Sequence, residues 1–118
     1  MSGIQEIDSH QLANWMENDP ESFLLVDVRN ANEVSQGMLP AAQALPMHLI
    51  PLKLDELRGK EKIVFYCRTG ARSGQVCAFL QQQGVQPVLN LRGGILDWFR
   101  HGLPIEAPQA PAFAVQAV

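Results

Sequence analysis

The sequence is poor in cysteine, with only Cys67 and Cys77 among its 118 residues. Two cysteines cannot form the disulfide framework of a small secreted domain, and no Cys or His pair has zinc-finger spacing. No apolar run approaches the roughly 18 residues of a membrane-spanning helix. The first residues, MSGIQEIDSHQL, lack the basic and apolar segments of a secretory leader. We therefore expect a cytoplasmic protein in a reducing compartment, with no membrane contact and no bound metal.

The chain also lacks an excess of positive charge. Its 9 Lys and Arg residues are outnumbered by 12 Asp and Glu residues, which gives a net charge of −3 at pH 7. Proteins that bind nucleic acids usually carry a basic patch, so we expect no nucleic-acid partner. Apolar residues make up 47% of the chain and charged residues 18%, which is the balance of an ordinary globular protein. A chain of this length forms one core, and we expect a single domain that acts as a monomer.

Short apolar runs without polar alternation indicate strands that are buried on both faces. These runs are residues 23–28 and 63–66 and, more weakly, residues 87–91. We also expect a short strand at residues 44–45 and an edge strand at residues 5–7. Stretches with helical spacing lie between them, at residues 8–18, 31–36, 49–57, 73–83 and 93–101. The alternation predicts an α/β fold with a mostly parallel central sheet of about four or five strands and helices on both faces.

Two of the expected helices have recognisable features. Asp8 and Gln11 have the spacing of a capping box at the start of the first helix. In the last helix we expect Ile95, Trp98 and Phe99 to form the buried side.

The composition changes abruptly at Glu106. The remaining residues, EAPQAPAFAVQAV, are rich in Ala, Pro and Gln and show no periodicity. We expect the folded domain to cover residues 1–105 and residues 106–118 to form a flexible C-terminal tail.

Ligands of parallel sheets bind beyond the carboxyl ends of the strands, so the residues after each apolar run are the candidate site. Three segments qualify, namely residues 27–29, 67–73 and 92–94. Since parallel strands end at the same edge of a sheet, we expect the three segments to meet there.

Cys67 follows a buried strand, and a short loop with Gly70 leads from it into a helix. Inward-pointing loop amides, the positive end of the helix dipole and the charges of Arg68 and Arg72 all favour a thiolate. We therefore expect Cys67 to have a lowered pKa and to be a nucleophile rather than an inert core thiol. Cys77 falls on an apolar stripe and is expected to pack in the core.

The spacing from Cys67 to Arg72 is Cys-x4-Arg. This loop is one residue shorter than the Cys-x5-Arg loop of cysteine-dependent phosphatases, which surrounds a phosphoryl group. A smaller ring suits a single extra sulfur atom, and loop length alone suggests a persulfide on Cys67.

Over residues 7–105 the chain resembles the single-domain rhodanese-like sulfurtransferases. Four segments carry the resemblance, and they read LLVDVRNANEV, GMLPAAQALP, VFYCRTGARS and NLRGGILDWFRHGLPI. The resemblance implies a rhodanese-like fold with Cys67 as the sulfur-carrying nucleophile. It also implies that the loop around Cys67 binds substrate, through Arg68, Thr69, Gly70, Ala71, Arg72 and Ser73. For Arg68 a merely solvated surface charge remains an equal alternative.

Other matching residues are expected to support the site. By the resemblance, Asp27 and Arg29 brace it. Glu33 is four residues after Arg29 and is expected to be its ion-pair partner. We expect Gly93 and Gly94 to form a tight turn rather than a phosphate-binding loop. The sequence departs from the family at Met38, where the family usually has a histidine. This change is expected to affect local packing and substrate access more than activity.

The resemblance implies a thiosulfate sulfurtransferase that works through a Cys67 persulfide without a cofactor. The donor would be a small sulfur anion such as thiosulfate. The acceptor would be cyanide in the test tube and a thiol or thioredoxin-like protein in the cell. Two alternatives remain open, a cysteine phosphatase or arsenate reductase on the same fold and a non-catalytic docking or regulatory module.

Overall fold

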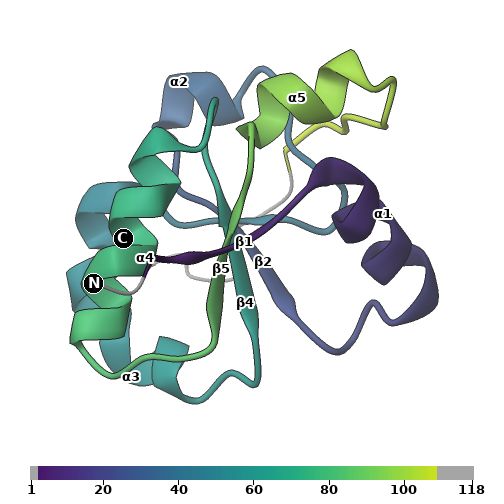
Figure 1. Ribbon diagram of the computed structural model, residues 1–118. Coiled ribbons are helices and arrows are strands. Elements are labelled where there is room, and N and C mark those ends of the chain that lie inside the picture. The colour runs from purple at the N-terminus through teal and green to yellow at the C-terminus, as the bar shows by residue number, and fades with distance from the viewer. Residues whose placement is uncertain (1–2, 109–118) are drawn as a thin grey trace.

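The computed structural model describes residues 3–108 of the chain. Five strands form one sheet in the order β1-β5-β4-β2-β3, and every neighbouring pair runs parallel (Figure 1). The strands are β1 (Gln5–Ile7), β2 (Leu24–Asp27), β3 (Gln43–Ala44), β4 (Ile63–Tyr66) and β5 (Val88–Leu91). The sheet confirms the predicted α/β architecture, and β4 and β5 lie at its centre with β2.

Helices cover both faces of the sheet (Figure 1). They are α1 (Ser9–Asn18) and α5 (Gly94–Arg100) on one face, and the 3-10 helix η1 (Met47–Lys53), α3 (Leu54–Arg58) and α4 (Ala71–Gln82) on the other. The short helix α2 (Ala31–Val34) lies near the carboxyl ends of the strands. Since strand side chains alternate between faces, β4 contributes Val64 and Tyr66 to the core under α1 and α5, and Phe65 to the core under α4.

The predicted helices are present, except that one of them is divided into two helices of different type. The capping box of α1 is confirmed, because the Asp8 side chain accepts from the Gln11 amide and the Gln11 side chain accepts from the Asp8 amide. The expected helix over residues 49–57 is instead divided into η1 and α3. Pro51 lies inside this stretch and has no N–H to donate, which weakens α-helical hydrogen bonding there.

The prediction for the buried side of α5 was wrong for Phe99. Trp98 is 1% exposed and donates its indole N–H to Pro104 O, whereas Phe99 is 65% exposed. Adjacent helical residues point about 100° apart, so a seven-residue helix that buries Trp98 turns Phe99 outward.

Glu106, which the sequence places at the start of the expected tail, forms backbone hydrogen bonds with Met38. Met38 and Glu106 exchange two backbone hydrogen bonds, each of 2.8 Å, so that Glu106 is joined to the body. Residues 109–118, which make up most of the expected flexible tail, lie outside the described residues.

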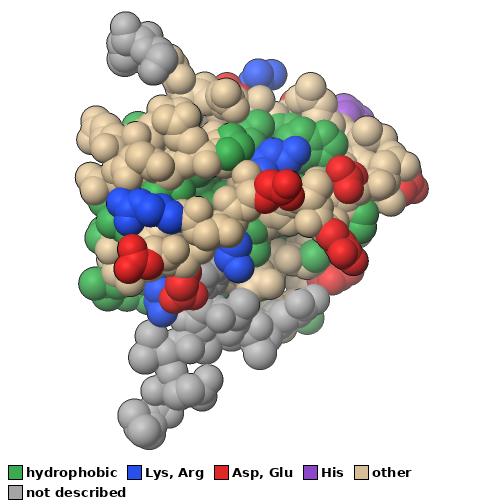
Figure 2. Space-filling view, turned by 90° about the horizontal axis from the view of Figure 1, so that it is seen from below, with side chains coloured by type: hydrophobic (Ala, Val, Ile, Leu, Met, Phe, Trp, Pro, Cys, Tyr) green, Lys and Arg blue, Asp and Glu red, His purple; other side chains and the backbone are tan. Residues whose placement is uncertain are grey.

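The face at the amino ends of the strands carries charges of both signs. Figure 2 shows the molecule from this side, with Lys and Arg side chains beside Asp and Glu side chains. The η1–α3 segment contains two ion pairs, Lys53 with Glu56 and Arg58 with Asp55. Within residues 3–108 no helix is long and apolar enough to cross a membrane.

Candidate active site

The three candidate segments meet at the carboxyl edge of the sheet, as expected. Asp27 ends β2, Cys67 directly follows β4, and Gly93 follows β5 after a two-residue step. These three strands are neighbours in the order β5-β4-β2. The Cys67 loop therefore lies between the other two segments.

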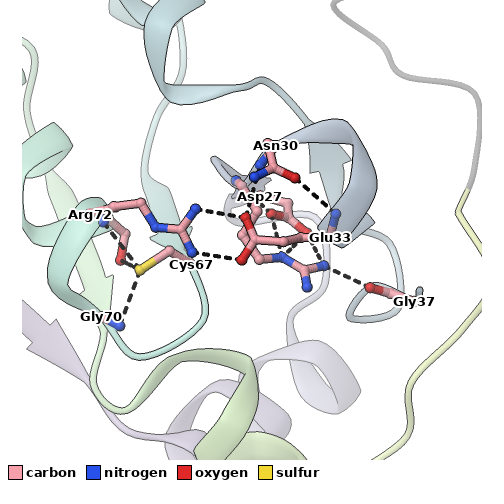
Figure 3. Close-up of polar contacts among 9 residues, drawn as sticks. Asp27, Asn30, Glu33, Gly37, Cys67, Gly70 and Arg72 are labelled. Atoms are coloured by element: carbon pink, nitrogen blue, oxygen red, sulfur yellow. Dashed lines mark hydrogen bonds and ion pairs between the residues drawn. The ribbon is translucent and has the colours of Figure 1, made fainter. Parts of the chain in front are cut away.

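Cys67 is enclosed by its own loop, with 1% of its surface exposed. Its Sγ accepts hydrogen bonds from Gly70 N at 3.1 Å and from Ser73 N at 3.4 Å, and Ser73 Oγ also lies 3.4 Å from it (Figure 3). Burial raises the pKa of this thiol, but the contacts from Ser73 and the amides of Gly70 and Thr69 outweigh burial and lower it below its ordinary value. The loop thus holds a sulfur atom at a focus of N–H groups.

Cys77 has the opposite environment. It lies on the buried side of α4, in the core, and burial raises its pKa to about 12. A neutral thiol among apolar side chains is a poor nucleophile. The two cysteines are therefore distinguished by their surroundings, as the sequence analysis expected.

The start of α5 binds the backbone of the Cys67 loop through hydrogen bonds. Ile95 N donates to Cys67 O and Leu96 N donates to Arg68 O, each at 3.0 Å. This approach requires Gly94, which has a φ of +60° and no side chain; a Cβ built there would lie 2.5 Å from Cys67 O. Gly93 and Gly94 thus form the expected tight turn, and its function is to let two helical amides reach the loop carbonyls.

Replacement of Gly94 by alanine should therefore disturb both the fold and the loop. We expect Gly94→Ala to lower the free energy of unfolding by more than about 2 kcal/mol, because the new Cβ meets backbone and the φ is left-handed. Gly102→Ala is the matched control, since Gly102 has a φ of +72° but nothing within 4 Å of the built Cβ. It should lose only about 1 kcal/mol. Equal losses in urea unfolding of the two variants would contradict a role in supporting the loop.

The ion-pair partner predicted for Glu33 was wrong. Glu33 forms two hydrogen bonds with Arg72, at 2.7 and 2.8 Å, and the described residues contain no ion pair between Glu33 and Arg29 (Figure 3). Glu33 Oε1 also accepts from Asn30 N, which completes the capping box of α2. Glu33 therefore connects α2 to the start of α4, and the Arg72 guanidinium is held by this carboxylate.

The Glu33–Arg72 pair predicts a specific pH dependence. The hydrogen bond from Arg72 lowers the pKa of Glu33 from 4.5 to about 2. A lowered folded-state pKa stabilises the protein above the unfolded-state value, and this stabilisation is lost as the pH falls towards the folded-state value. We expect Glu33→Gln to be less stable than the wild type at pH 7, with the difference shrinking between pH 4.5 and about 2.

Thermal unfolding across this pH range checks the prediction. Glu56→Gln is the matched control, because it removes an exposed pair with Lys53 and should change stability little at any pH. A stability difference for Glu33→Gln that stays constant from neutral to acidic pH would contradict the assigned pairing.

Asp27 and Arg29 form a buried brace beside the loop. Asp27 is 0% exposed and Arg29 is 5% exposed, and the Arg29 side chain donates to both carboxylate oxygens. Arg29 Nη2 also donates to Gly37 O at 2.7 Å. The brace thus connects the end of β2 to the segment that leads into β3. These contacts stabilise the backbone beside the Cys67 loop. Among the described residues, neither Asp27 nor Arg29 forms a hydrogen bond with Cys67 Sγ.

Met38, at which the sequence departs from the resemblance, is buried in the same region. It is 2% exposed and packs in the core under α1 and α5. Its side chain therefore contributes to the hydrophobic core.

Arg68 is exposed, and within residues 3–108 it forms no ion pair. It lines a pocket of about 330 Å³ together with apolar side chains, which are Ile95, Leu96, Phe99 and Ile105. Phe99, which α5 turns outward, thus forms part of the pocket wall. Of the remaining loop residues, Thr69 and Ala71 are exposed and Ser73 is buried. The described part of the chain has no group of three or more His, Cys, Asp or Glu residues that could hold a metal ion.

Asn90 was not identified as a site residue from the sequence. It lies in β5 and is 3% exposed. Asn90 Oδ1 accepts from Ser73 Oγ at 2.5 Å, and Asn90 Nδ2 donates to Gly70 O at 3.1 Å. The available signal was a single polar residue inside an otherwise apolar strand.

The chain matches the model of the rhodanese-like domain family over residues 8–101. A sulfurtransferase of Allochromatium vinosum is 55% identical to it over 106 residues, which are 90% of this chain and 98% of the relative. The thiosulfate sulfurtransferase GlpE of Actinobacillus pleuropneumoniae is 33% identical over 101 residues, covering 86% of this chain and 92% of the relative. The crystal structure of a rhodanese-like domain protein from Staphylococcus aureus has a TM-score of 0.76 and 30% identity, and covers 88% of this chain and 100% of that one.

Proposed function

The chain belongs to the rhodanese-like family, and on that premise we propose that it is a sulfurtransferase that carries sulfur on Cys67. Relatives named as sulfurtransferases support rhodanese-type sulfur transfer in general. The observation that carries the assignment to Cys67 is the convergence of the Gly70 and Ser73 amides on its Sγ. Such a focus stabilises a thiolate before reaction and an anionic sulfur atom after it.

In the first half of the proposed reaction, the Cys67 thiolate attacks the outer sulfur of a donor such as thiosulfate. A bond forms between Sγ and the outer sulfur, and the sulfur–sulfur bond of the donor breaks. Sulfite leaves with the bonding electron pair, and Cys67 keeps the outer sulfur as an anionic persulfide. The total charge is unchanged, and the step requires no oxidant or cofactor.

In the second half, the thiolate of an acceptor attacks the outer sulfur of the persulfide. The bond from the outer sulfur to Cys67 Sγ breaks, and its electron pair returns to Sγ as a thiolate. The acceptor leaves as a persulfide, or as thiocyanate when cyanide replaces the thiol. A small thiol or a thioredoxin-like protein is the proposed cellular acceptor.

The surroundings of the loop suggest roles for the other residues. The free charge of exposed Arg68 is suited to hold the departing anion, and the apolar wall with Phe99 offers a surface for the acceptor. Arg72 is bound to Glu33, so we assign it to holding the loop rather than to binding the donor. Asp27, Arg29, Gly93 and Gly94 support the loop from its two sides.

The two alternatives make different predictions. A phosphatase or arsenate reductase needs room for a tetrahedral anion, whereas the Cys-x4-Arg loop here already closes its amides around Sγ. A non-catalytic module has no physical need for a thiol at the focus of several donors. Phosphatase assays of the purified protein should therefore show no activity that depends on Cys67.

The mass of the intact protein after incubation with thiosulfate tests the proposal. We expect a gain of one sulfur atom, which cyanide or a small thiol then removes. Peptide mapping should place this atom on Cys67 and not on Cys77. A protein that gains no sulfur from thiosulfate or from a persulfide donor would refute the proposed activity.

A further inference from the structure

A second layer of polar side chains lies behind the Cys67 loop. It runs from Ser73 to Asn90 and on to Glu6, whose carboxylate also pairs with Arg92. Ser73 and Asn90 are almost fully buried, at 0% and 3% exposure. The cluster touches Cys67 only through Ser73, and nothing in the reaction described above uses it.

The orientation of the Asn90 carboxamide is determined by its neighbours. Asn90 Nδ2 lies 3.1 Å from Glu6 Oε2 and 3.1 Å from Gly70 O. A carboxylate and a backbone carbonyl only accept hydrogen bonds here, so both protons of Nδ2 are used. The carbonyl oxygen Oδ1 must then face Ser73, and it can only accept.

The Ser73 hydroxyl has two neighbours but a single proton. Its Oγ lies 2.5 Å from Asn90 Oδ1 and 3.4 Å from Cys67 Sγ. Because Oδ1 cannot donate, the short contact requires the Ser73 proton to point at Asn90. The side of Oγ that faces Cys67 then presents lone pairs, which suit a neutral S–H group and not a thiolate.

We propose that Asn90 is a positioning residue, which holds the Ser73 hydroxyl proton away from Cys67 and leaves the amides of Gly70 and Ser73 to hold the thiolate. Asn90 also ties the loop carbonyl of Gly70 to β5, which keeps these amides aimed at Sγ. The part that this thiolate plays in sulfur transfer rests on the proposed function.

The proposal gives an unusual expectation for Ser73→Ala. If the hydroxyl donated to Sγ in the resting protein, its removal would raise the Cys67 pKa by about one unit, as expected for a hydrogen bond to a charged group. If Asn90 holds the proton, removal should change the Cys67 pKa by less than about half a unit. Stability should still fall, because the buried carbonyl of Asn90 loses its donor.

The effect of Asn90 itself is measured with a double-mutant cycle. Asn90→Leu frees the Ser73 proton to turn to Sγ, which should lower the Cys67 pKa, but it also releases Gly70 O and exposes the loop to Glu6. These side effects persist when Asn90→Leu is combined with Ser73→Ala. We therefore compare the Cys67 pKa shift that Asn90→Leu causes in the wild type with the shift that it causes in Ser73→Ala. The difference between the two shifts is the contribution of the Ser73 hydroxyl, and we expect it to lower the Cys67 pKa by about one unit.

The readout is the ultraviolet absorbance of the thiolate as a function of pH, in the full chain without any sulfur donor. Cys77, with a pKa raised to about 12, does not titrate in the same range. Burial also raises the pKa of Tyr66, the one tyrosine of the chain. The charged groups around the loop are unchanged in all variants; they are Glu6 with Arg92, Asp27 with Arg29, Glu33 with Arg72, and Arg68.

A rise of about one unit in Ser73→Ala, or a coupling near zero in the cycle, would overturn the proposal. If Asn90→Leu does not fold, Asn90→Ala removes the same carbonyl, and Ser73→Ala remains decisive alone. Since the titration needs no sulfur donor, it separates this inference from the proposed activity. A chain that failed to load sulfur could still show the coupling, and an active enzyme could lack it.

Discussion

Cys67→Ser should fold normally but lose sulfur transfer, with turnover falling by about 10³-fold or more. The same loop amides would surround the serine hydroxyl, but this group is not ionised at neutral pH and cannot form a persulfide. Thiocyanate production from thiosulfate and cyanide measures the loss, and circular dichroism reports the fold. The variant should also gain no sulfur in the intact mass after incubation with thiosulfate.

Cys77→Ala is the matched control for this experiment. Cys77 is 0% exposed and lies in the core beneath α4, so alanine there removes a small buried group. We expect a loss of about 1 kcal/mol in stability and nearly full turnover. Normal thiocyanate production by Cys67→Ser would refute the assignment of the nucleophile, and an inactive but folded Cys77→Ala would require a relay between both cysteines.

Arg29→Met should produce the largest loss of stability. It leaves the Asp27 carboxylate, which is 0% exposed, without its charged partner and removes the hydrogen bond to Gly37 O. Breaking one side of a buried pair costs about 3–5 kcal/mol, a large part of the stability of a domain of this size. Urea unfolding at neutral pH measures the loss.

The double variant Asp27→Asn, Arg29→Met tests the origin of that loss. Without the carboxylate no buried charge is left unpaired, so the double variant should regain about half or more of the lost stability. The folded fraction of Arg29→Met should still load sulfur on Cys67, because the brace does not touch Sγ. An unchanged unfolding midpoint together with lost turnover would instead assign Arg29 to the chemistry.

The fold could be predicted because local and global signals agree. The apolar runs that form β2, β4 and β5 suit only strands covered on both faces, and helical stretches between them lead to parallel crossovers. The capping box at Asp8 is a local feature, and it formed as the spacing indicates. Predictions that depended on weaker sequence signals were less accurate, as for the helix around Pro51 and for the side chain of Phe99, which faces outward.

The place of the site could also be predicted, but its pairings could not. Sequence spacing brings Glu33 within one helical turn of Arg29, and that proximity suggested an ion pair. Arg72 is 39 residues away from Glu33, and only the packing of α4 beside α2 brings the two together. The pairing of Met38 with Glu106 is equally invisible in the sequence, because it depends on where the chain returns after α5.

The sequence by itself determined the fold class, the candidate nucleophile and the length of the loop around it, because these depend on local pattern and on the order of elements along the chain. The tertiary structure decided which donors face Cys67 Sγ, which acid holds Arg72 and which side chain contacts the Ser73 hydroxyl. Hydrogen bonds depend on direction and on distances of a few tenths of an ångström. Contacts between residues far apart in the chain meet these conditions only once both faces of the sheet are packed.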